Sequence, residues 1–121
     1  MQHASYKGTD MTDYQKLAEE YAEDIVENMT EDQGEEYIYD TAHEYADGSE
    51  HVIYTAKAHD MVAWMHQSRI SYWEGEIGAG GTFNGYDELA CRIAYYELCD
   101  MITAAALKLF EEKESEAAWL Y

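Results

Sequence analysis

The sequence predicts an all-α protein, a compact bundle of about four helices with a glycine-rich connection before a long last helix. Apolar residues recur at helical spacing in several segments, and none of the 121 residues is a proline. Hydrophobic residues make up 47% of the chain, with twelve tyrosines, although the net charge is −19. A disordered acidic chain is poor in such residues. We therefore expect one folded domain that spans residues 1–121.

The first helix is expected to run from about residue 13 to residue 30. Thr12 and Gln15 have the spacing of a capping box, with a hydroxyl three residues before an amide side chain. The apolar positions behind it follow a period of 3.6 residues: Tyr14, Leu17, Ala18, Tyr21, Ile25, Val26 and Met29. Gly34 is predicted to interrupt the helical pattern.

A second, shorter helix is expected around Ile38, Ala42 and Tyr45, and it should end at residues 47–49. Ser49 is a candidate N-cap for a third helix. The apolar stripe of that helix consists of Val52, Ile53, Ala56, Met61, Trp64 and Met65. The β-branched residues near its start leave a strand over 51–55 as an alternative.

Residues 69–85 carry five of the eight glycines and are predicted to form an irregular, flexible connection. The last helix is expected from about residue 86 to residue 113. Its apolar positions are Leu89, Ile93, Tyr96, Met101, Ile102, Ala105, Leu109 and Phe110. The C-terminal residues 115–121 either extend this helix or form a separate short turn.

Acidic residues outnumber basic ones by 26 to 7, and they are unevenly placed. The net charge is −13 over residues 1–50, −1 over residues 51–85 and −5 over residues 86–121. Nucleic acids and anionic membrane surfaces would repel such a chain, so neither is an expected partner. Basic proteins, basic peptides and metal cations remain as partners, and a basic protein is the one expected.

Cys91 and Cys99 fall in the same predicted helix, eight residues apart. This spacing separates them by about 12 Å along the helix axis, which is too far for a disulfide between them. Two free thiols are typical of a reducing compartment. No segment has the pattern of a secretion signal or a membrane span, so a cytoplasmic location is expected.

The first predicted helix carries a row of carboxylates in which Glu19, Glu23 and Glu27 follow one another at four-residue spacing. Like charges at this spacing cost about 0.2 to 0.5 kcal/mol per pair. Counted over residues 13–31, the row has about one charge per 4 Å, close to the 3.4 Å per phosphate of a DNA strand. The alternative is a solvated acidic face without a partner.

Other chemistry is weakly indicated. His51, His59 and His66 lack the spacing of a metal site, and the glycines of residues 78–81 lack the lysine of a phosphate-binding loop. A cysteine paired with a histidine is conceivable, but both cysteines fall in an apolar helical pattern, where thiols are inert. We expect no metal, no cofactor and no enzymatic activity.

The extreme acidity, the many tyrosines, the unbroken carboxylate rows and the tract IYDTAHEYADGSEHVIYTAKAHDMV at residues 38–62 resemble small acidic phage proteins. The chain is similar in this respect to the DNA-mimic inhibitors of phages and plasmids, which include anti-restriction and anti-CRISPR proteins. The resemblance implies an inhibitor that occupies the DNA-binding cleft of a nuclease complex in the cytoplasm of a bacterial host. The phosphate mimics would be Glu19, Glu20, Glu23, Asp24, Glu27, Glu31, Asp32, Glu35, Glu36, Asp40, Glu44 and Asp47.

Two other functions stay open at this point. One is an acidic adaptor that binds a basic nucleoid or regulatory protein. The other is an allosteric inhibitor that acts through residues 64–85, where Trp64, Tyr72 and Trp73 occur in a nearly neutral segment. The same segment is a candidate face for a homodimer, since members of the inhibitor family often act as dimers.

Overall fold

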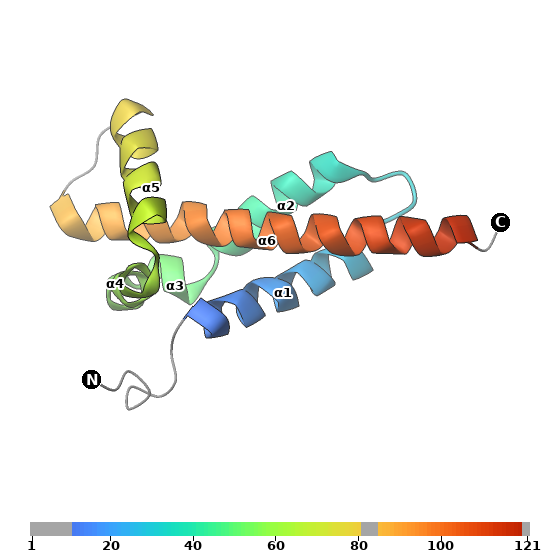
Figure 1. The fold of residues 1–121 in the computed structure, drawn as a ribbon, viewed down its shortest axis with the longest axis horizontal. Coiled ribbons are helices and arrows are strands. Elements are labelled where there is room, and N and C mark those ends of the chain that lie inside the picture. The colour runs from blue at the N-terminus through green and yellow to red at the C-terminus, as the bar shows by residue number, and fades with distance from the viewer. Residues whose placement is uncertain (1–10, 81–84, 120–121) are drawn as a thin grey trace.

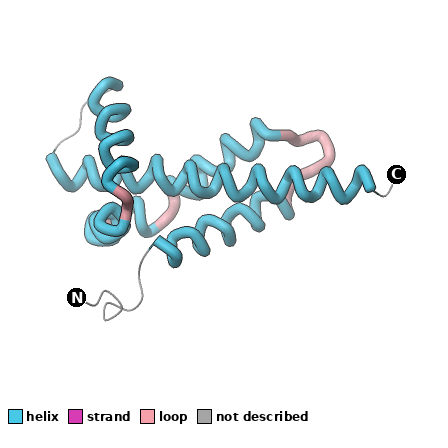
Figure 2. Tube along the Cα trace, viewed as in Figure 1, coloured by secondary structure: helices cyan, strands magenta, loops and turns pink. Residues whose placement is uncertain are grey.

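A computed structural model describes the backbone over residues 11–80 and 85–119. The helices are α1 (Met11–Glu27), α2 (Glu35–Asp47), α3 (Glu50–Ile53), α4 (Thr55–Trp64), α5 (Gln67–Gly80) and α6 (Gly85–Trp119). Over these two ranges the chain contains no strand (Figure 2). The all-α prediction is confirmed, with six helices in place of about four.

Helix α6 is the central element, because the other helices are arranged along it (Figure 1). Its 35 residues correspond to a length of about 52 Å at 1.5 Å per residue. Helices α1 and α2 run antiparallel to each other and pack on α6 as well as on one another. Helices α3, α4 and α5 gather around the N-terminal part of α6. The molecule therefore has a three-helix end, made by α1, α2 and the C-terminal part of α6, and a second end with shorter helices.

Small residues form much of the core between the three long helices. The buried alanines at these contacts are Ala18 and Ala22 on α1, Ala42 and Ala46 on α2, and Ala94 and Ala106 on α6. Larger side chains, among them Tyr14, Ile25 and Leu98, fill the space around them and are fully buried. Alanine allows helix axes to approach closely and has the highest intrinsic helix propensity, so these positions favour both the helices and their contacts.

Helix α1 ends at Glu27, which is earlier than the sequence predicts. The Asn28 side-chain amide donates to the Asp24 carbonyl oxygen at 2.7 Å, and the Thr30 backbone N–H donates to the Gln33 side chain at 2.8 Å. Side chains that satisfy backbone groups in this way compete with helix continuation. The break therefore begins at residue 28 and not at Gly34, and residues 28–34 form the connection to α2.

The starts of the first and third helices differ in how well they were predicted. Helix α1 begins at Met11, so Thr12 lies inside its first turn and is not the N-cap. Ser49 is confirmed as the N-cap of α3, since its hydroxyl accepts the backbone N–H of His51 at 3.2 Å. The predicted third helix is divided at Tyr54, whose backbone is extended (φ −92°, ψ 119°). Residues 50–53 are helical, so the alternative of a strand over 51–55 is wrong.

The segment predicted to be irregular contains helix α5. Trp73 and Ile77 of this helix are buried with Met65 and Ile93 in a second, smaller core cluster. Their burial outweighs the low helix propensity of the glycines between and after them. The rest of the predicted glycine-rich connection, residues 81–84, lies outside the described residues.

Helix α6 continues to Trp119, so the C-terminal residues up to that position extend the last helix. Both cysteines on α6 are free thiols, as predicted, with Cys99 buried and Cys91 half-buried. In the described part of the chain, no helix is long and apolar enough to cross a membrane.

Candidate protein-binding surface

All twelve carboxylates predicted as phosphate mimics are exposed, and they lie on α1, on α2 and in the connection between these helices. Five are on α1, two are in the connection and five are on α2. In order they are Glu19, Glu20, Glu23, Asp24 and Glu27; Glu31 and Asp32; and Glu35, Glu36, Asp40, Glu44 and Asp47. Glu31 and Asp32 thus lie outside any helix, which corrects the predicted continuous row over residues 13–31.

On α2 the carboxylates form a single stripe. Ile38, Ala42 and Ala46 are buried and define the core side of the helix. With 100° per residue, Glu36, Asp40, Glu44 and Asp47 all fall on the opposite side. The stripe points away from the core and is about 16 Å long at 1.5 Å per residue.

On α1 the carboxylates spread around the helix and do not follow one line. Glu19 and Glu23 line a groove between α1 and α6. Asp24 lies on the other side and accepts a hydrogen bond from the Tyr45 hydroxyl of α2. Because α1, α2 and α6 all contact one another, their outer faces point in different directions. The negative charge therefore surrounds the three-helix end and is not confined to one flat face.

None of the twelve carboxylates forms an ion pair within the described residues. The ion pairs there lie closer to the other end: Lys57 with Glu50, His59 with Asp87, Arg69 with Glu97 and Asp100, and Arg92 with Glu88. The sequence explains the difference, since residues 17–56 contain thirteen acidic residues and no lysine or arginine. Between Leu17 and Ala56 the negative charge on α1, α2 and their connection is therefore not offset by any lysine or arginine of the same segment.

Several of these carboxylates also oppose the helix dipole. Asp24 and Glu27 lie in the last turn of α1, and Glu44 and Asp47 lie in the last turn of α2; neither turn contains a basic residue. A negative charge at a helix C-terminus is unfavourable by about 0.3 to 1 kcal/mol. Only Glu35 and Glu36, in the first turn of α2, are placed where the dipole favours them. Helix stability therefore does not account for most of the acidic residues.

Three of the twelve side chains make hydrogen bonds in the described structure, and the other nine make none there. Asp24 accepts from Tyr45, and this hydrogen bond raises the pKa of the Tyr45 hydroxyl to about 12. Asp32 accepts from the Thr30 hydroxyl at 2.5 Å, which lowers the pKa of the Asp32 carboxyl. Glu19 accepts from the Gln15 amide at 3.3 Å. The remaining carboxylates are open to solvent.

Sequence reasoning missed two acidic residues that complete this surface. Glu112 and Glu116 of α6 are exposed, and they line the same groove as Glu23 and Glu27 of α1. The four-residue spacing of Glu112 and Glu116 places both on one side of α6, and this could have been predicted from the sequence. The contact between the C-terminal part of α6 and α1 could not be read from the sequence.

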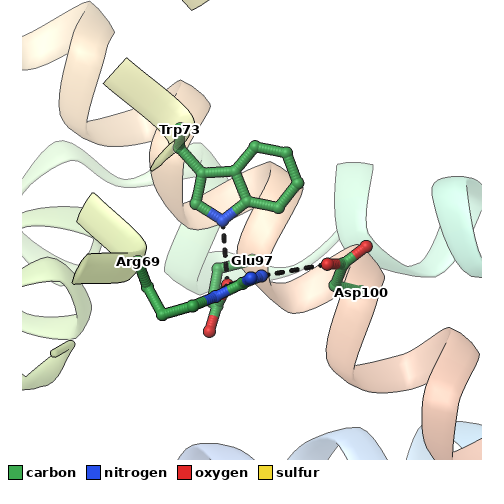
Figure 3. A network of polar contacts seen from close by, with 4 residues as sticks. All are labelled: Arg69, Trp73, Glu97 and Asp100. Carbon is green, nitrogen blue, oxygen red and sulfur yellow. Dashed lines mark hydrogen bonds and ion pairs between the residues drawn. The ribbon is translucent and has the colours of Figure 1, made fainter. Parts of the chain in front are cut away.

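The other polar cluster that sequence reasoning missed holds α5 against α6 (Figure 3). One oxygen of Glu97 accepts the Trp73 indole N–H at 2.8 Å and two Arg69 N–H groups at 3.0 and 2.7 Å. Arg69 also donates to Asp100 at 3.0 Å. The Trp73 ring stacks on Tyr96. Because Arg69 and Trp73 of α5 bond to side chains of α6, this cluster stabilises the contact between the two helices.

The candidate nucleophile Cys99 does have a histidine neighbour. Its sulfur lies 3.5 Å from the Nδ1 atom of His43, which is also 2.5 Å from the Tyr95 hydroxyl oxygen. Burial raises the pKa of the Cys99 thiol. A reactive cysteine needs the opposite shift, so this arrangement does not supply an activated nucleophile. In the described ranges, no group of three His, Cys, Asp or Glu side chains is arranged to hold a metal ion.

Comparison with known proteins gives no relative. No protein-family model, no curated protein and no solved structure matches this chain.

Proposed function

We propose that the protein is a DNA mimic that occupies the DNA-binding cleft of a bacterial host-defence nuclease complex, either a CRISPR effector or a restriction enzyme. The observation that carries the proposal is the set of twelve exposed carboxylates on α1, α2 and their connection, none in an ion pair within the described residues. Clefts that bind DNA are lined by Lys and Arg placed to neutralise phosphates. Such a cleft offers cations to carboxylates that form no ion pair within the described residues.

The density of charge supports a duplex as the imitated ligand. The five carboxylates on α2 span residues 35–47, about 18 Å, and the five on α1 run antiparallel beside them over residues 19–27, so the ten occupy about 2 Å of axis each. B-form DNA carries one phosphate per about 1.7 Å when both strands are counted. The spread of carboxylates around the three-helix end also suits a cleft that encloses a duplex on several sides.

An acidic adaptor for a nucleoid protein would use the same charges, but it has no feature of its own to favour it. An allosteric inhibitor acting through residues 64–85 would need aromatic side chains free to contact a partner. Trp73 is buried and hydrogen-bonded to Glu97, and Trp64 is half-buried. Tyr72 is the exposed aromatic residue of this segment as far as it is described. We therefore favour the mimic.

The proposal is tested by determining which carboxylates contribute to binding of the nuclease complex. We would measure binding of a purified nuclease complex to the wild type and to the double variant Asp40→Asn/Glu44→Gln, which neutralises the middle of the α2 stripe. Because both side chains are exposed and point away from the core, the fold should be retained. Loss of two contacts to cationic groups should weaken binding about tenfold.

The matched control is Glu74→Gln/Glu76→Gln on α5, which removes the same two charges from exposed positions at the other end. If the protein is a DNA mimic, this control variant should bind the nuclease complex nearly as well as the wild type does. If both double variants lose affinity equally, net charge alone attracts the partner and no defined surface is used. If the target is a nucleoid protein and no nuclease binds, the adaptor replaces the mimic.

A further inference from the structure

A groove runs along the three-helix end between α1 and α6. It consists of three successive hollows of about 410, 360 and 330 Å³. The first and second share Glu23, Leu109 and Glu112, and the second and third share Val26 and Lys113. The three hollows are therefore neighbours, and the first two together make a channel that follows α6 from Ala104 to Glu116.

The lining of the groove is divided by chemistry. Apolar side chains are present in all three hollows, namely Ala104, Ala105, Leu109, Val26, Met29 and Phe110. The carboxylates along it come from both helices, namely Glu19, Glu23, Glu27, Glu31, Glu112, Glu114 and Glu116. Two lysines, Lys108 and Lys113, also line it. Seven acidic and two basic side chains leave the groove strongly negative, with an apolar component that a phosphate mimic does not need.

We propose that this groove binds a basic amphipathic α-helix of the partner protein, with apolar side chains against Ala104, Ala105 and Leu109 and lysine or arginine side chains against the carboxylates. Recognition of a helix in a groove depends on an apolar face laid into a channel and on flanking charges that complement it. From residue 104 to residue 116 the channel is about 18 Å long, which accommodates about twelve residues of helix.

The inference rests on the proposed function for the identity of the partner but adds a distinct requirement. A pure phosphate mimic gains affinity from charge alone. The groove predicts that apolar contacts also contribute, and that the part of the target that enters it is helical. A variant that fills the groove without changing any charge separates the two ideas.

Ala104→Trp is that variant. Ala104 is exposed and lines the first hollow, so a large side chain there obstructs the channel and leaves the core and all carboxylates in place. Ala63→Trp is the matched control, because Ala63 is an exposed alanine on α4. Circular dichroism and a urea titration establish that both variants are folded. Glu112→Gln/Glu116→Gln is a second groove variant that inserts no bulky group.

The probe is a synthetic 14-residue peptide with leucines at positions i, i+3, i+4 and i+7 of a helix and lysines at the charged positions. A peptide with the same number of lysines, and with serine in place of leucine, is its control. Fluorescence anisotropy should show that the wild type binds the leucine peptide about tenfold more tightly. Ala104→Trp should abolish this difference, and Ala63→Trp should preserve it. Glu112→Gln/Glu116→Gln should weaken binding of both peptides.

Equal affinity for the two peptides, or a leucine-dependent difference that survives in Ala104→Trp, would overturn the groove proposal. The same variants, measured against a captured nuclease complex, separate the groove from the mimic. If Ala104→Trp binds the complex normally and Asp40→Asn/Glu44→Gln does not, the groove proposal fails and the mimic stands. If the peptides behave as expected but no DNA-binding protein is a target, the groove proposal stands and the mimic fails.

Discussion

At the scale of single residues, the protein uses polar groups in two opposite ways. Glu97 is 8% exposed and accepts three hydrogen bonds, whereas the carboxylates of the α2 stripe are exposed and accept none from the described residues. A buried carboxylate has to be paired, because an unpaired charge in the interior is costly. The acidic composition is visible in the sequence, but which carboxylate is buried and paired depends on how α5 crosses α6. Periodicity within one helix cannot supply that information.

Trp73→Phe should destabilise the protein by about 1 to 3 kcal/mol, because it removes a hydrogen bond to a charged, buried acceptor and keeps an aromatic ring against Tyr96. The free energy of unfolding in urea measures the effect. Tyr72→Phe is the control: Tyr72 is exposed and should change this free energy by less than about 0.5 kcal/mol. If the two variants are equally stable, the indole hydrogen bond does not stabilise the contact between α5 and α6.

His51 should make stability depend on pH. Its Nδ1 atom is buried and has no hydrogen-bond partner in the described structure, and its ring contacts the edge of Tyr14. Burial lowers the pKa of His51 despite the nearby Glu50 and Asp60 carboxylates. A lowered pKa means that the unfolded chain binds the proton more readily than the folded chain does. Folding therefore gains stability from keeping His51 neutral; this gain is complete above about pH 6.5 and is lost as the pH falls below that value.

His51→Phe keeps an aromatic ring in this position and removes the titrating group. As the pH falls from 8 to 5.5, the wild type should lose stability through His51 and the variant should not. We therefore expect the free energy of unfolding of the variant, minus that of the wild type, to increase as the pH falls over this range. Taking the difference cancels the contributions of the carboxylates, which titrate in both proteins. A difference that stays constant over this range would contradict a lowered pKa for His51.

At the scale of elements, the long helices were predictable and the connections were not. Strong periodicity identified α1, α2 and α6 because their apolar faces meet in one core. The end of α1 was misplaced because the Asn28 side chain competes for a backbone carbonyl, and the predicted third helix was divided at Tyr54, between residues whose β-branched side chains disfavour helix. Helix α5 was missed because its glycines mask a helix that tertiary contacts stabilise.

If tertiary contacts hold α5 in place despite its low helix propensity, replacing its glycines with alanine should stabilise the protein. A Cβ atom at Gly75 or Gly78 would meet no atom within 4 Å. Gly75→Ala and Gly78→Ala should each stabilise the protein by about 0.5 to 1 kcal/mol, since alanine loses less backbone entropy in a helix. Gly85→Ala should destabilise it, because Gly85 has a φ of +84°. Thermal unfolding measures all three; destabilisation by both α5 variants would contradict a regular helix at these positions.

At the scale of the whole molecule, charge is segregated along the long axis. The three-helix end carries the twelve carboxylates without ion pairs among the described residues, and the basic residues that do form ion pairs lie nearer the other end. The sequence predicted the list of exposed carboxylates, because charged positions on amphipathic helices face solvent. It did not predict their arrangement around three helices or the groove with α6, since both depend on tertiary contacts. Self-repulsion of this kind opposes folding, which is why we assign it to recognition.

The most direct test of the mimic is the affinity of the target nuclease complex for DNA at increasing concentrations of this protein. Fluorescence anisotropy with a labelled duplex gives the apparent Kd at each concentration. If the protein and DNA occupy the same cleft, the apparent Kd should rise in direct proportion to the concentration of the protein and without limit, and no complex containing both should form. An apparent Kd that levels off, or that does not change although the protein is bound, would contradict occupation of the DNA-binding cleft.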